Sequence, residues 1–163
     1  MENIYKIVMF GDNAVGKTSI ITQYIEKKFE DDYKMTIGID ISAKLLQIDE
    51  KNVCLFIWDI GGQKQYKIIH KSYLKGAFGA ILVYDCTNKN SFNHVFDWVE
   101  ECGRFYGDIP LILAGNKIDL TDEKVVSAEE GAKLAKEIKA DFFETSAKTG
   151  KNINKIFTSL VKL

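Results

Sequence analysis

The sequence predicts an α/β protein built on a mostly parallel β-sheet, with residues 1–163 forming a single domain. Short apolar runs alternate with stretches of helical periodicity along the whole chain, which is the pattern of repeated strand–helix units. Ala80–Tyr84 and Leu111–Ala114 are continuously apolar, as expected for strands that helices cover on both faces. Polar motifs follow several of the apolar runs directly, so the candidate chemistry lies at the carboxyl ends of strands.

Composition narrows the class of protein. The net charge is −1, so no long-range field favours nucleic acid or an anionic membrane as a partner. No apolar run approaches the roughly 18 residues needed to span a bilayer, and the N-terminus lacks a signal-peptide pattern. Cys54, Cys86 and Cys102 follow neither a disulfide nor a zinc spacing, which favours a reducing, intracellular compartment. We expect a cytoplasmic protein that is monomeric and does not bind nucleic acid.

The first part of the chain predicts a strand, a helix and an exposed loop. Ile4–Phe10 is an apolar run suited to a buried strand. Ser19–Ile25 continues as a helix whose apolar side chains gather on one side. The next stretch, Lys27–Thr36, is polar with scattered aromatic residues, which is typical of an exposed loop.

A hairpin follows this loop. The strand-like runs Ile37–Ile48 and Val53–Asp59 are joined by the polar residues Asp49–Asn52, which predicts antiparallel pairing of the two runs. The isoleucines of Ile37–Ile41 alternate with other residues, so we expect the first strand to be half exposed and near the edge of the sheet.

The second half of the chain predicts helices and a short strand. One helix has an apolar stripe at i, i+3, i+4 and i+7 spacing, which indicates packing on the core. The stripe consists of Phe92, Val95, Phe96 and Val99. Ser127 and Glu130 form a capping box that opens a helix through about Lys139, and Asp141–Glu144 is a short strand. The apolar face of the last helix consists of Ile153, Ile156, Phe157, Leu160 and Val161.

Between the first strand and the first helix, Gly11–Thr18 has the pattern G-x-x-x-x-G-K-[ST] of a phosphate-binding loop. A strand that turns through glycines into a helix directs backbone N–H groups and the positive end of the helix dipole at bound phosphate. Lys17 reaches the β- and γ-phosphates in this arrangement, and the Thr18 hydroxyl is placed to bind Mg²⁺. The alternative is a glycine-rich turn without a ligand, which the flanking strand and helix disfavour.

A second motif, Trp58–Gln63, stands at the end of the third apolar run. Asp59 is well placed there to hold Mg²⁺, directly or through water, opposite the phosphate-binding loop. Gly62 presents its backbone N–H to a γ-phosphate without a side chain in the way, and Gln63 is placed to orient an attacking water. Alone, this D-x-x-G pattern is also typical of a plain strand-to-loop turn. Its pairing with the phosphate-binding loop favours the functional interpretation.

A third motif, Asn116–Asp119, follows the strand-like run at Leu111–Ala114. The Asp119 carboxylate accepts two hydrogen bonds from one ligand edge, and guanine, unlike adenine, offers N1–H and an exocyclic amine side by side. Leaving a buried acceptor unpaired costs roughly 1–3 kcal/mol or more, so Asp119 selects guanine. Backbone N–H groups of Thr145–Lys148 are placed to reach the guanine O6. The alternative for N-K-x-D alone is a turn or a helix start.

Together these motifs resemble those of Ras-superfamily small GTPases. GDNAVGKTS, TIG, WDIGGQ, NKID and ETSAK occur in the order and approximate spacing of that superfamily, over essentially all 163 residues. Within it the chain is most similar to the Rab family, through TIGIDI, SYLKGAFGAILVYDCTNKNSF and ETSAKTGKNINKIF. The resemblance implies the small G-domain fold of P-loop NTPases. In that fold a six-stranded sheet, with five parallel strands and one antiparallel strand, is flanked by about five helices.

The resemblance also implies roles for individual residues. Phe29 would lie edge-on against the guanine, Tyr33 would close over the phosphates, Lys117 would lie along the base, and Thr36 would bind Mg²⁺ only when a γ-phosphate is present. The implied nucleotide-binding residues are Asn13, Ala14, Val15, Gly16, Lys17, Thr18, Ser19, Phe29, Tyr33, Thr36, Gly62, Asn116, Lys117, Asp119, Ser146, Ala147 and Lys148. The implied catalytic residues are Gln63, Lys17 and Gly62. The implied Mg²⁺ site consists of Thr18, Thr36 and, through water, Asp59.

The implied function is that of a Rab-like GTP/GDP switch, which hydrolyses GTP slowly and regulates vesicle and membrane traffic through effectors bound in the GTP state. Effectors, exchange factors and GTPase-activating proteins would bind two switch regions, Lys27–Thr36 and Ile60–Tyr73. The alternative is a GTP-binding interaction module with little or no hydrolysis, and the presence of Gln63 favours the hydrolysing switch. An ATP-dependent phosphotransferase is disfavoured, because Asp119 opposes adenine.

Four features depart from the Rab pattern. Ile60-Gly61 replaces the usual Thr-Ala, and the added glycine predicts a looser second switch. Lys64 replaces the usual Glu on the surface that partners recognise, and Asn13 lies where an activating protein's arginine enters, so partners of familiar Rab proteins do not transfer. The chain stops at Leu163 without the usual prenylated cysteines. We expect a peripheral position on internal membranes only if a lipidated tail follows.

Overall fold

The computed structural model describes residues 3–48, 50–61 and 75–162. Its strands are β1 (Asn3–Phe10), β2 (Ile39–Ile48), β3 (Lys51–Ile60), β4 (Gly79–Asp85), β5 (Leu111–Asn116) and β6 (Asp141–Glu144). Its helices are α1 (Lys17–Glu26), α3 (Lys89–Asn93), α4 (Val95–Tyr106), α5 (Ala128–Glu137) and α6 (Ile153–Val161), with a short 3₁₀ helix, η2, at Thr121–Glu123. Within these residues, no helix has the length and apolar character needed to cross a membrane.

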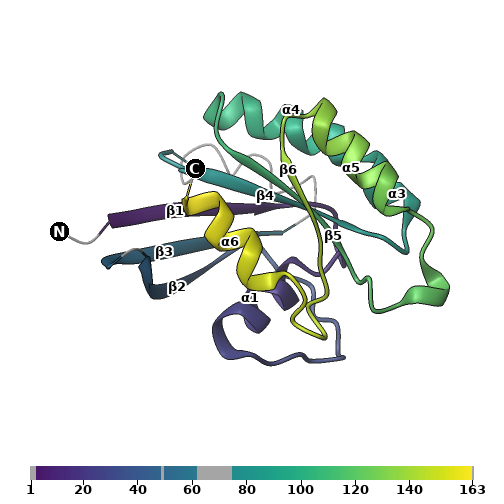
Figure 1. Cartoon of the computed structure of the whole chain (residues 1–163), viewed down its shortest axis with the longest axis horizontal. Helices are drawn as coiled ribbons and strands as arrows, with labels where there is room; N and C mark the ends of the chain where they lie inside the picture. Colours follow the sequence, from purple (N-terminus) through teal and green to yellow (C-terminus); the bar gives the residue numbers. More distant parts are fainter. Residues whose placement is uncertain (1–2, 49, 62–74, 163) are drawn as a thin grey trace.

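The strands form one six-stranded sheet in the order β2-β3-β1-β4-β5-β6 (Figure 1). β1 pairs in parallel with both β3 and β4, and β4–β5 and β5–β6 are also parallel pairs. Among the strands that the structure describes, only β2 is antiparallel to its neighbour. The predicted α/β class with one antiparallel strand is therefore confirmed. Five parallel strands end at the same edge of the sheet, so the described loops that follow β1, β4, β5 and β6 begin at one edge.

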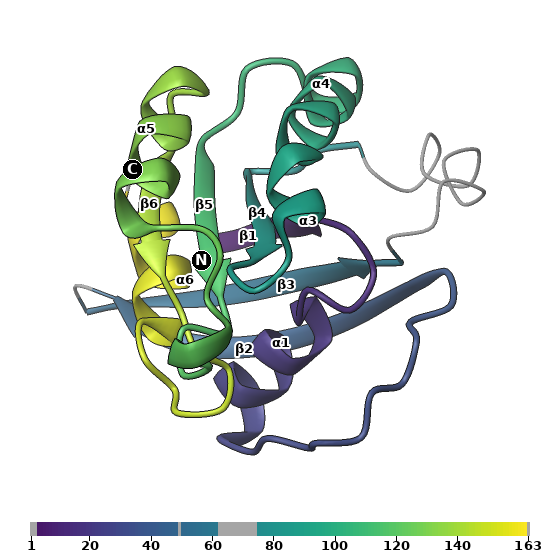
Figure 2. The ribbon, with the colours of Figure 1, turned by 90° about the vertical axis from the view of Figure 1, so that its right-hand side faces the viewer.

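Helices cover both faces of the sheet (Figures 1 and 2). On one face α1 and α6 pack together, and Tyr24 stacks on Phe157 with ring centroids 4.0 Å apart. On the other face Leu82 of β4 belongs to a core with Trp98 of α4 and Leu134 of α5. All seven residues of β4 are buried, which confirms the prediction that this apolar run is covered on both faces.

The predicted hairpin is confirmed, but its boundaries differ from the prediction. Ile48 pairs with Lys51, so the predicted loop residues Lys51 and Asn52 belong to β3. At the other end β2 begins two residues later than predicted, because Gly38 adopts a positive φ of 78° that a strand does not accommodate. β2 lies at the sheet edge with alternating exposure, as predicted.

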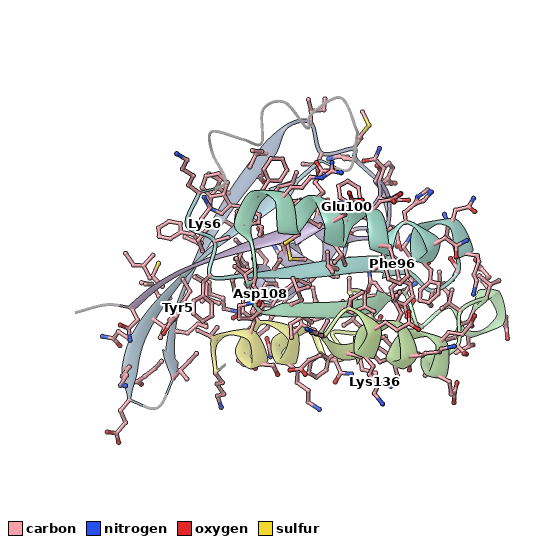
Figure 3. The ribbon with its side chains drawn as sticks, turned by 90° about the horizontal axis from the view of Figure 1, so that it is seen from above. Tyr5, Lys6, Phe96, Glu100, Asp108 and Lys136 are labelled. Carbon is pink, nitrogen blue, oxygen red and sulfur yellow. The ribbon has the colours of Figure 1, made fainter. Side chains whose placement is uncertain are left out.

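The predicted core stripe is wrong at Phe96, whose side chain is 52% exposed on α4 (Figure 3). The helical segment divides at His94 into α3 and α4, and α4 turns its own face to the core through Val95, Trp98 and Cys102. At about 100° per residue, Phe96 lies well outside the arc that these three buried side chains define. The spacing was correct for a helix, but it did not identify the buried face.

The later predicted elements agree closely with the structure. The Ser127 hydroxyl accepts a hydrogen bond from the Glu130 N–H at 3.2 Å, and Glu130 accepts one from the Ser127 N–H at 2.9 Å, which confirms the capping box. α5 ends at Glu137, slightly before the predicted Lys139, where a positive φ of 56° stops the helix. The three cysteines are buried and form no disulfide.

The contact of α5 with the sheet predicts a position-specific effect on stability. At Gly131 an added Cβ would lie 2.4 Å from the Phe142 ring and 2.5 Å from the Tyr84 hydroxyl. We expect Gly131→Ala to lower the free energy of unfolding by about 1–3 kcal/mol, since the core must shift. Gly103→Ala, in open space on α4, should raise it by about 0.5–1 kcal/mol. Urea denaturation with saturating GDP measures both, and equal effects would contradict this packing.

Candidate nucleotide site

The loop between β1 and α1 is packed too closely for side chains at its two glycines. Gly11 has φ 148°, and a Cβ there would lie 2.3 Å from the Val83 carbonyl oxygen. Gly16 has φ 102°, and a Cβ there would lie 2.3 Å from Asn116 Nδ2. Gly16 is also the N-cap of α1, and no described side chain caps this helix. The first N–H groups of α1 are therefore available to a ligand, at the positive end of the helix dipole.

Lys17 is buried at the foot of this loop. Its ammonium donates hydrogen bonds to the backbone carbonyls of Gly11 and Asp12, each at 2.8 Å. Burial lowers the pKa of Lys17 to about 8, against the opposing effect of the Asp59 and Asp12 carboxylates. The side chain is thus a positive charge held inside the loop at neutral pH.

The Asp12 side chain ties the same loop to α4. Its carboxylate accepts a hydrogen bond from the indole Nε1 of Trp98 at 2.8 Å and lies 2.5 Å from Nδ1 of His94. Trp98 is itself part of the core on that face of the sheet. The loop is therefore fixed at its second residue by a side chain from the helical layer.

Three oxygen-bearing side chains meet beside the loop. Thr18 Oγ1 lies 2.7 Å from Thr36 Oγ1, the Thr18 hydroxyl donates to Asp59, and Thr36 Oγ1 lies 3.4 Å from the same carboxylate oxygen. The other Asp59 oxygen is buried without a hydrogen-bond partner among the described residues. Burial raises the pKa of Asp59, although the two hydroxyls and Lys17 act in the opposite direction. Hydroxyl and carboxylate oxygens are ligands that suit Mg²⁺.

The carboxamide of Asn116 links three loops. Its Nδ2 donates to the Val15 carbonyl at 3.0 Å, on the loop before α1. Its Oδ1 accepts hydrogen bonds from the Thr145 hydroxyl at 3.1 Å and the Ala147 N–H at 3.2 Å, both in the loop after β6. Asn116 is 1% exposed, so water does not reach its carboxamide. The Val15 carbonyl, the Thr145 hydroxyl and the Ala147 N–H therefore rely on this carboxamide as their hydrogen-bond partner.

The lysine and the aspartate of the N-K-x-D motif also contact neighbouring loops. The Lys117 ammonium donates to the Ala14 carbonyl at 2.7 Å and lies 2.7 Å from an oxygen of Asp85. The Asp119 carboxylate accepts a hydrogen bond from the Ser146 hydroxyl at 2.7 Å. The N-K-x-D motif is thus joined on one side to the glycine-containing loop and on the other to the loop after β6.

These loops enclose one cavity of about 370 Å³. The residues expected from the sequence that line it are Asn13, Ala14, Gly16, Lys17, Thr18, Ser19, Phe29, Tyr33, Thr36, Asn116, Lys117, Asp119, Ala147 and Lys148. Phe29 and Lys148 face each other, with the ammonium 6.0 Å from the ring centroid. Val15 and Ser146 are buried and bond to residues that line the cavity.

Comparison with known proteins identifies the family. The family model described as "Ras family" matches residues 6–163. Ras-related protein Rab-3C of Mus musculus and the same-named protein of Rattus norvegicus are each 42% identical to the chain over 161 residues, which is 98% of this chain and 71% of each relative. The chain belongs to the Ras family. It is a Rab-like small GTPase, an enzyme that binds GTP and GDP and hydrolyses GTP.

Part of the predicted machinery of this small GTPase lies outside the described residues. Gly62, Gln63 and Lys64 fall there with residues 65–73 of the predicted second switch, so their roles and the looseness of that switch stay predictions. Gly61 is described and buried, and its N–H donates to the Gly38 carbonyl at 2.9 Å. The predicted first switch, Lys27–Thr36, is an exposed loop without helix or strand.

The structure also brings residues to the site of this small GTPase that the sequence did not single out. The cavity is lined in addition by Thr22, Lys28, Glu30, Asp31, Asp32, Lys34 and Leu120. Five of these residues lie within Lys27–Thr36, the segment predicted to be an exposed functional loop, so the sequence identified their loop but not their place in the cavity lining. Asp85 ends the apolar run of β4 just as Asp59 ends that of β3, a similarity that could have identified it from the sequence.

The three-way link made by Asn116 predicts a large effect of its removal. Asn116→Ala would leave the Val15 carbonyl and the Ala147 N–H buried without partners, so we expect a loss of about 2–4 kcal/mol in the free energy of unfolding. Asn154→Ala, at an exposed position on α6, is the control and should change it by less than about 0.5 kcal/mol. Chemical denaturation of the nucleotide-free protein provides the measurement. Equal stabilities of the two variants would show that the three loops are held by other contacts.

Proposed function

We propose that this cavity binds the guanine nucleotide and that the protein acts as a Rab-like switch in vesicle traffic. The observation that carries the proposal is the convergence of the loops after β1, β5 and β6 on one cavity of about 370 Å³. Because Asn116 bonds to the first and last of these loops, the phosphate-binding pattern and the N-K-x-D motif form a single site. The cavity volume is in the range of small-molecule sites.

In this proposal the base lies between the loops after β5 and β6. The Asp119 carboxylate accepts hydrogen bonds from guanine N1–H and the exocyclic amine, and its existing bond to Ser146 fixes its orientation. The Phe29 ring and the Lys117 side chain, both in the cavity lining, contact the base from its sides. Adenine presents no matching pair of donors, so it would leave the carboxylate unpaired.

The phosphates lie over the glycine-containing loop in the same arrangement. Lys17 exchanges its bonds to the loop carbonyls for phosphate oxygens, and the N–H groups of Ala14–Ser19 together with the helix dipole add to the attraction. Thr18, Thr36 and Asp59 would hold Mg²⁺, the last through water, since they already form a cluster of oxygen ligands. When bound there, Mg²⁺ offsets negative charge on the phosphate oxygens.

For hydrolysis, we assign Gln63 to orienting the attacking water and the Gly62 N–H to contacting the γ-phosphate. The only arginine in the sequence is Arg104, which lies exposed on α4 and pairs with Glu100. The chain therefore supplies no arginine of its own to the transferring phosphoryl group. Unaided turnover on the order of 10⁻⁴ s⁻¹ is expected, with acceleration by an activating protein.

The switch regions are proposed as the contact surface for partners. Lys27–Thr36 is exposed and carries Thr36 to the oxygen cluster, so its position would report on the γ-phosphate. Effectors, exchange factors and activating proteins would bind this segment and Ile60–Tyr73, with the protein acting as a monomer at internal membranes. The departures at Gly61 and Lys64 set its choice of partners apart from that of familiar Rab proteins.

The role of Gln63 predicts a specific kinetic defect. In single-turnover assays with Mg²⁺, we expect Gln63→Leu to bind GTP normally and to hydrolyse it at least about tenfold more slowly than the wild type. Gln47→Leu, an exposed position on β2, is the matched control and should hydrolyse GTP at the wild-type rate. An unchanged rate in Gln63→Leu would contradict the water-orienting role. Tight GTP binding with no Gln63-dependent turnover would favour a non-hydrolysing interaction module.

The lowered pKa of Lys17 predicts the pH dependence of nucleotide affinity. Bound phosphate favours the ammonium form, and the free protein loses this proton as pH rises through about 8. Affinity for GDP should therefore be constant below that pH and about tenfold lower at pH 9 than at pH 7. Lys17→Arg keeps its charge throughout, so its weaker affinity should not depend on pH over this range. Calorimetric titration tests both. A wild-type affinity that does not change between pH 7 and pH 9 would contradict the expectation that loss of the Lys17 proton weakens nucleotide binding in this range.

A further inference from the structure

Asp85 is a buried carboxylate at the end of β4 that the proposed chemistry does not use. It is 6% exposed and pairs in register with Asn116 on β5. One of its oxygens lies 2.7 Å from the Lys117 ammonium, whose side chain is itself only 31% exposed. The other oxygen accepts hydrogen bonds from the Thr87 N–H at 2.8 Å and the Thr87 hydroxyl at 2.7 Å. The carboxylate is therefore held in one orientation, aimed at Lys117.

The contacts of Lys117 show what this orientation accomplishes. The ammonium also donates to the Ala14 carbonyl at 2.7 Å, so it bridges the end of β4 and the glycine-containing loop. Ala14 and Lys117 both have positive φ values, 62° and 68°. Residues other than glycine keep this backbone conformation only when the surrounding structure holds it in place. A lysine has a long flexible stem, and a fixed charge partner reduces the number of positions that its ammonium samples.

We propose that Asp85 is a positioning residue for guanine-nucleotide binding, which holds the Lys117 ammonium against the Ala14 carbonyl and so ties the base-binding loop to the phosphate-binding loop. This inference rests on the proposed function, in which Lys117 lies along the base. Asp85 does not touch the nucleotide in this arrangement and acts only through Lys117. Its loss releases the lysine stem from the cavity wall and lets the two loops move apart.

The proposal distinguishes the effect of Asp85 on binding from any effect on chemistry. The base and the loop at Ala14 are common to GDP and GTP, so Asp85→Asn should accelerate release of both nucleotides alike, by about tenfold. Hydrolysis of GTP that stays bound should proceed at the wild-type rate, because neither Asp85 nor Lys117 belongs to the oxygen cluster at Thr18. Loss of a residue that merely stabilised the fold would not accelerate nucleotide release while leaving hydrolysis of bound GTP unchanged.

A double-mutant cycle on nucleotide release tests the inference. The dissociation rates of fluorescently labelled GDP and GTP are measured with Mg²⁺ for wild type, Asp85→Asn, Lys117→Ala and the double variant. If Asp85 acts through Lys117, Asp85→Asn accelerates release in the wild type and has no further effect in the Lys117→Ala background. Asp108→Asn, an exposed aspartate before β5 (Figure 3), is the charge-matched control, with rates expected within about twofold of wild type.

Each other outcome contradicts a defined part of the account. Equal acceleration in both backgrounds, or none in either, would overturn the role of Asp85. If Lys117→Ala released nucleotide at the wild-type rate, the proposed contact of Lys117 with the base would be wrong. If Lys117→Ala accelerated release but Asp85→Asn did not, only the proposed role of Asp85 would be wrong. Should Asp85→Asn not fold, Thr87→Val removes the hydroxyl that orients the Asp85 carboxylate and must accelerate release in the wild type but not in the Lys117→Ala background. A wild-type rate for that variant would overturn the inference.

Discussion

The assembly of the site depends on the side-chain amide of Asn116. Three backbone or hydroxyl groups from loops distant in sequence, at Val15, Thr145 and Ala147, find their hydrogen-bond partner in this one buried group. Burying such groups without partners is unfavourable, so the loops are stable in these positions only together. The phosphate-binding pattern and the N-K-x-D motif, about a hundred residues apart, are thereby built into one pocket.

The sheet makes this link possible because parallel strands bring their carboxyl ends to one edge. β1 leads into the glycine-containing loop, β3 ends beside Asp59, and β4 and β5 end at the paired residues Asp85 and Asn116. Charges of both signs then alternate around the cavity. Lys17 lies near Asp59, and Lys117 lies against Asp85. A rigid sheet with loops cross-linked at its edge is suited to hold a charged nucleotide while the exposed segment Lys27–Thr36 remains free to respond to it.

Much of this organisation could be predicted from the sequence, because strand ends and motifs are local features. The six strands and the capping box at Ser127 followed from periodicity and motif spacing, and most of the residues that line the cavity followed from the motifs and from the resemblance to small GTPases. Features that depend on contacts between segments distant in the sequence could not be predicted in this way. Lys51, predicted to lie in the hairpin loop, belongs to β3 because it pairs with Ile48. Phe96, predicted to lie in the core, is exposed because the helix divides at His94 and α4 buries another face. The contact of Asp85 with Lys117 likewise depends on the register of β4 with β5.

We propose above that these linked loops recognise guanine through the Asp119 carboxylate. Calorimetric titration of the nucleotide-free protein with GDP, IDP and ADP, each with Mg²⁺, tests it most directly, because inosine keeps the N1–H of guanine and lacks its exocyclic amine. We expect IDP to bind about 10–100-fold more weakly than GDP, and ADP at least about 10³-fold more weakly. Equal affinities for GDP and ADP would contradict it, since the carboxylate would then make no contact with the base.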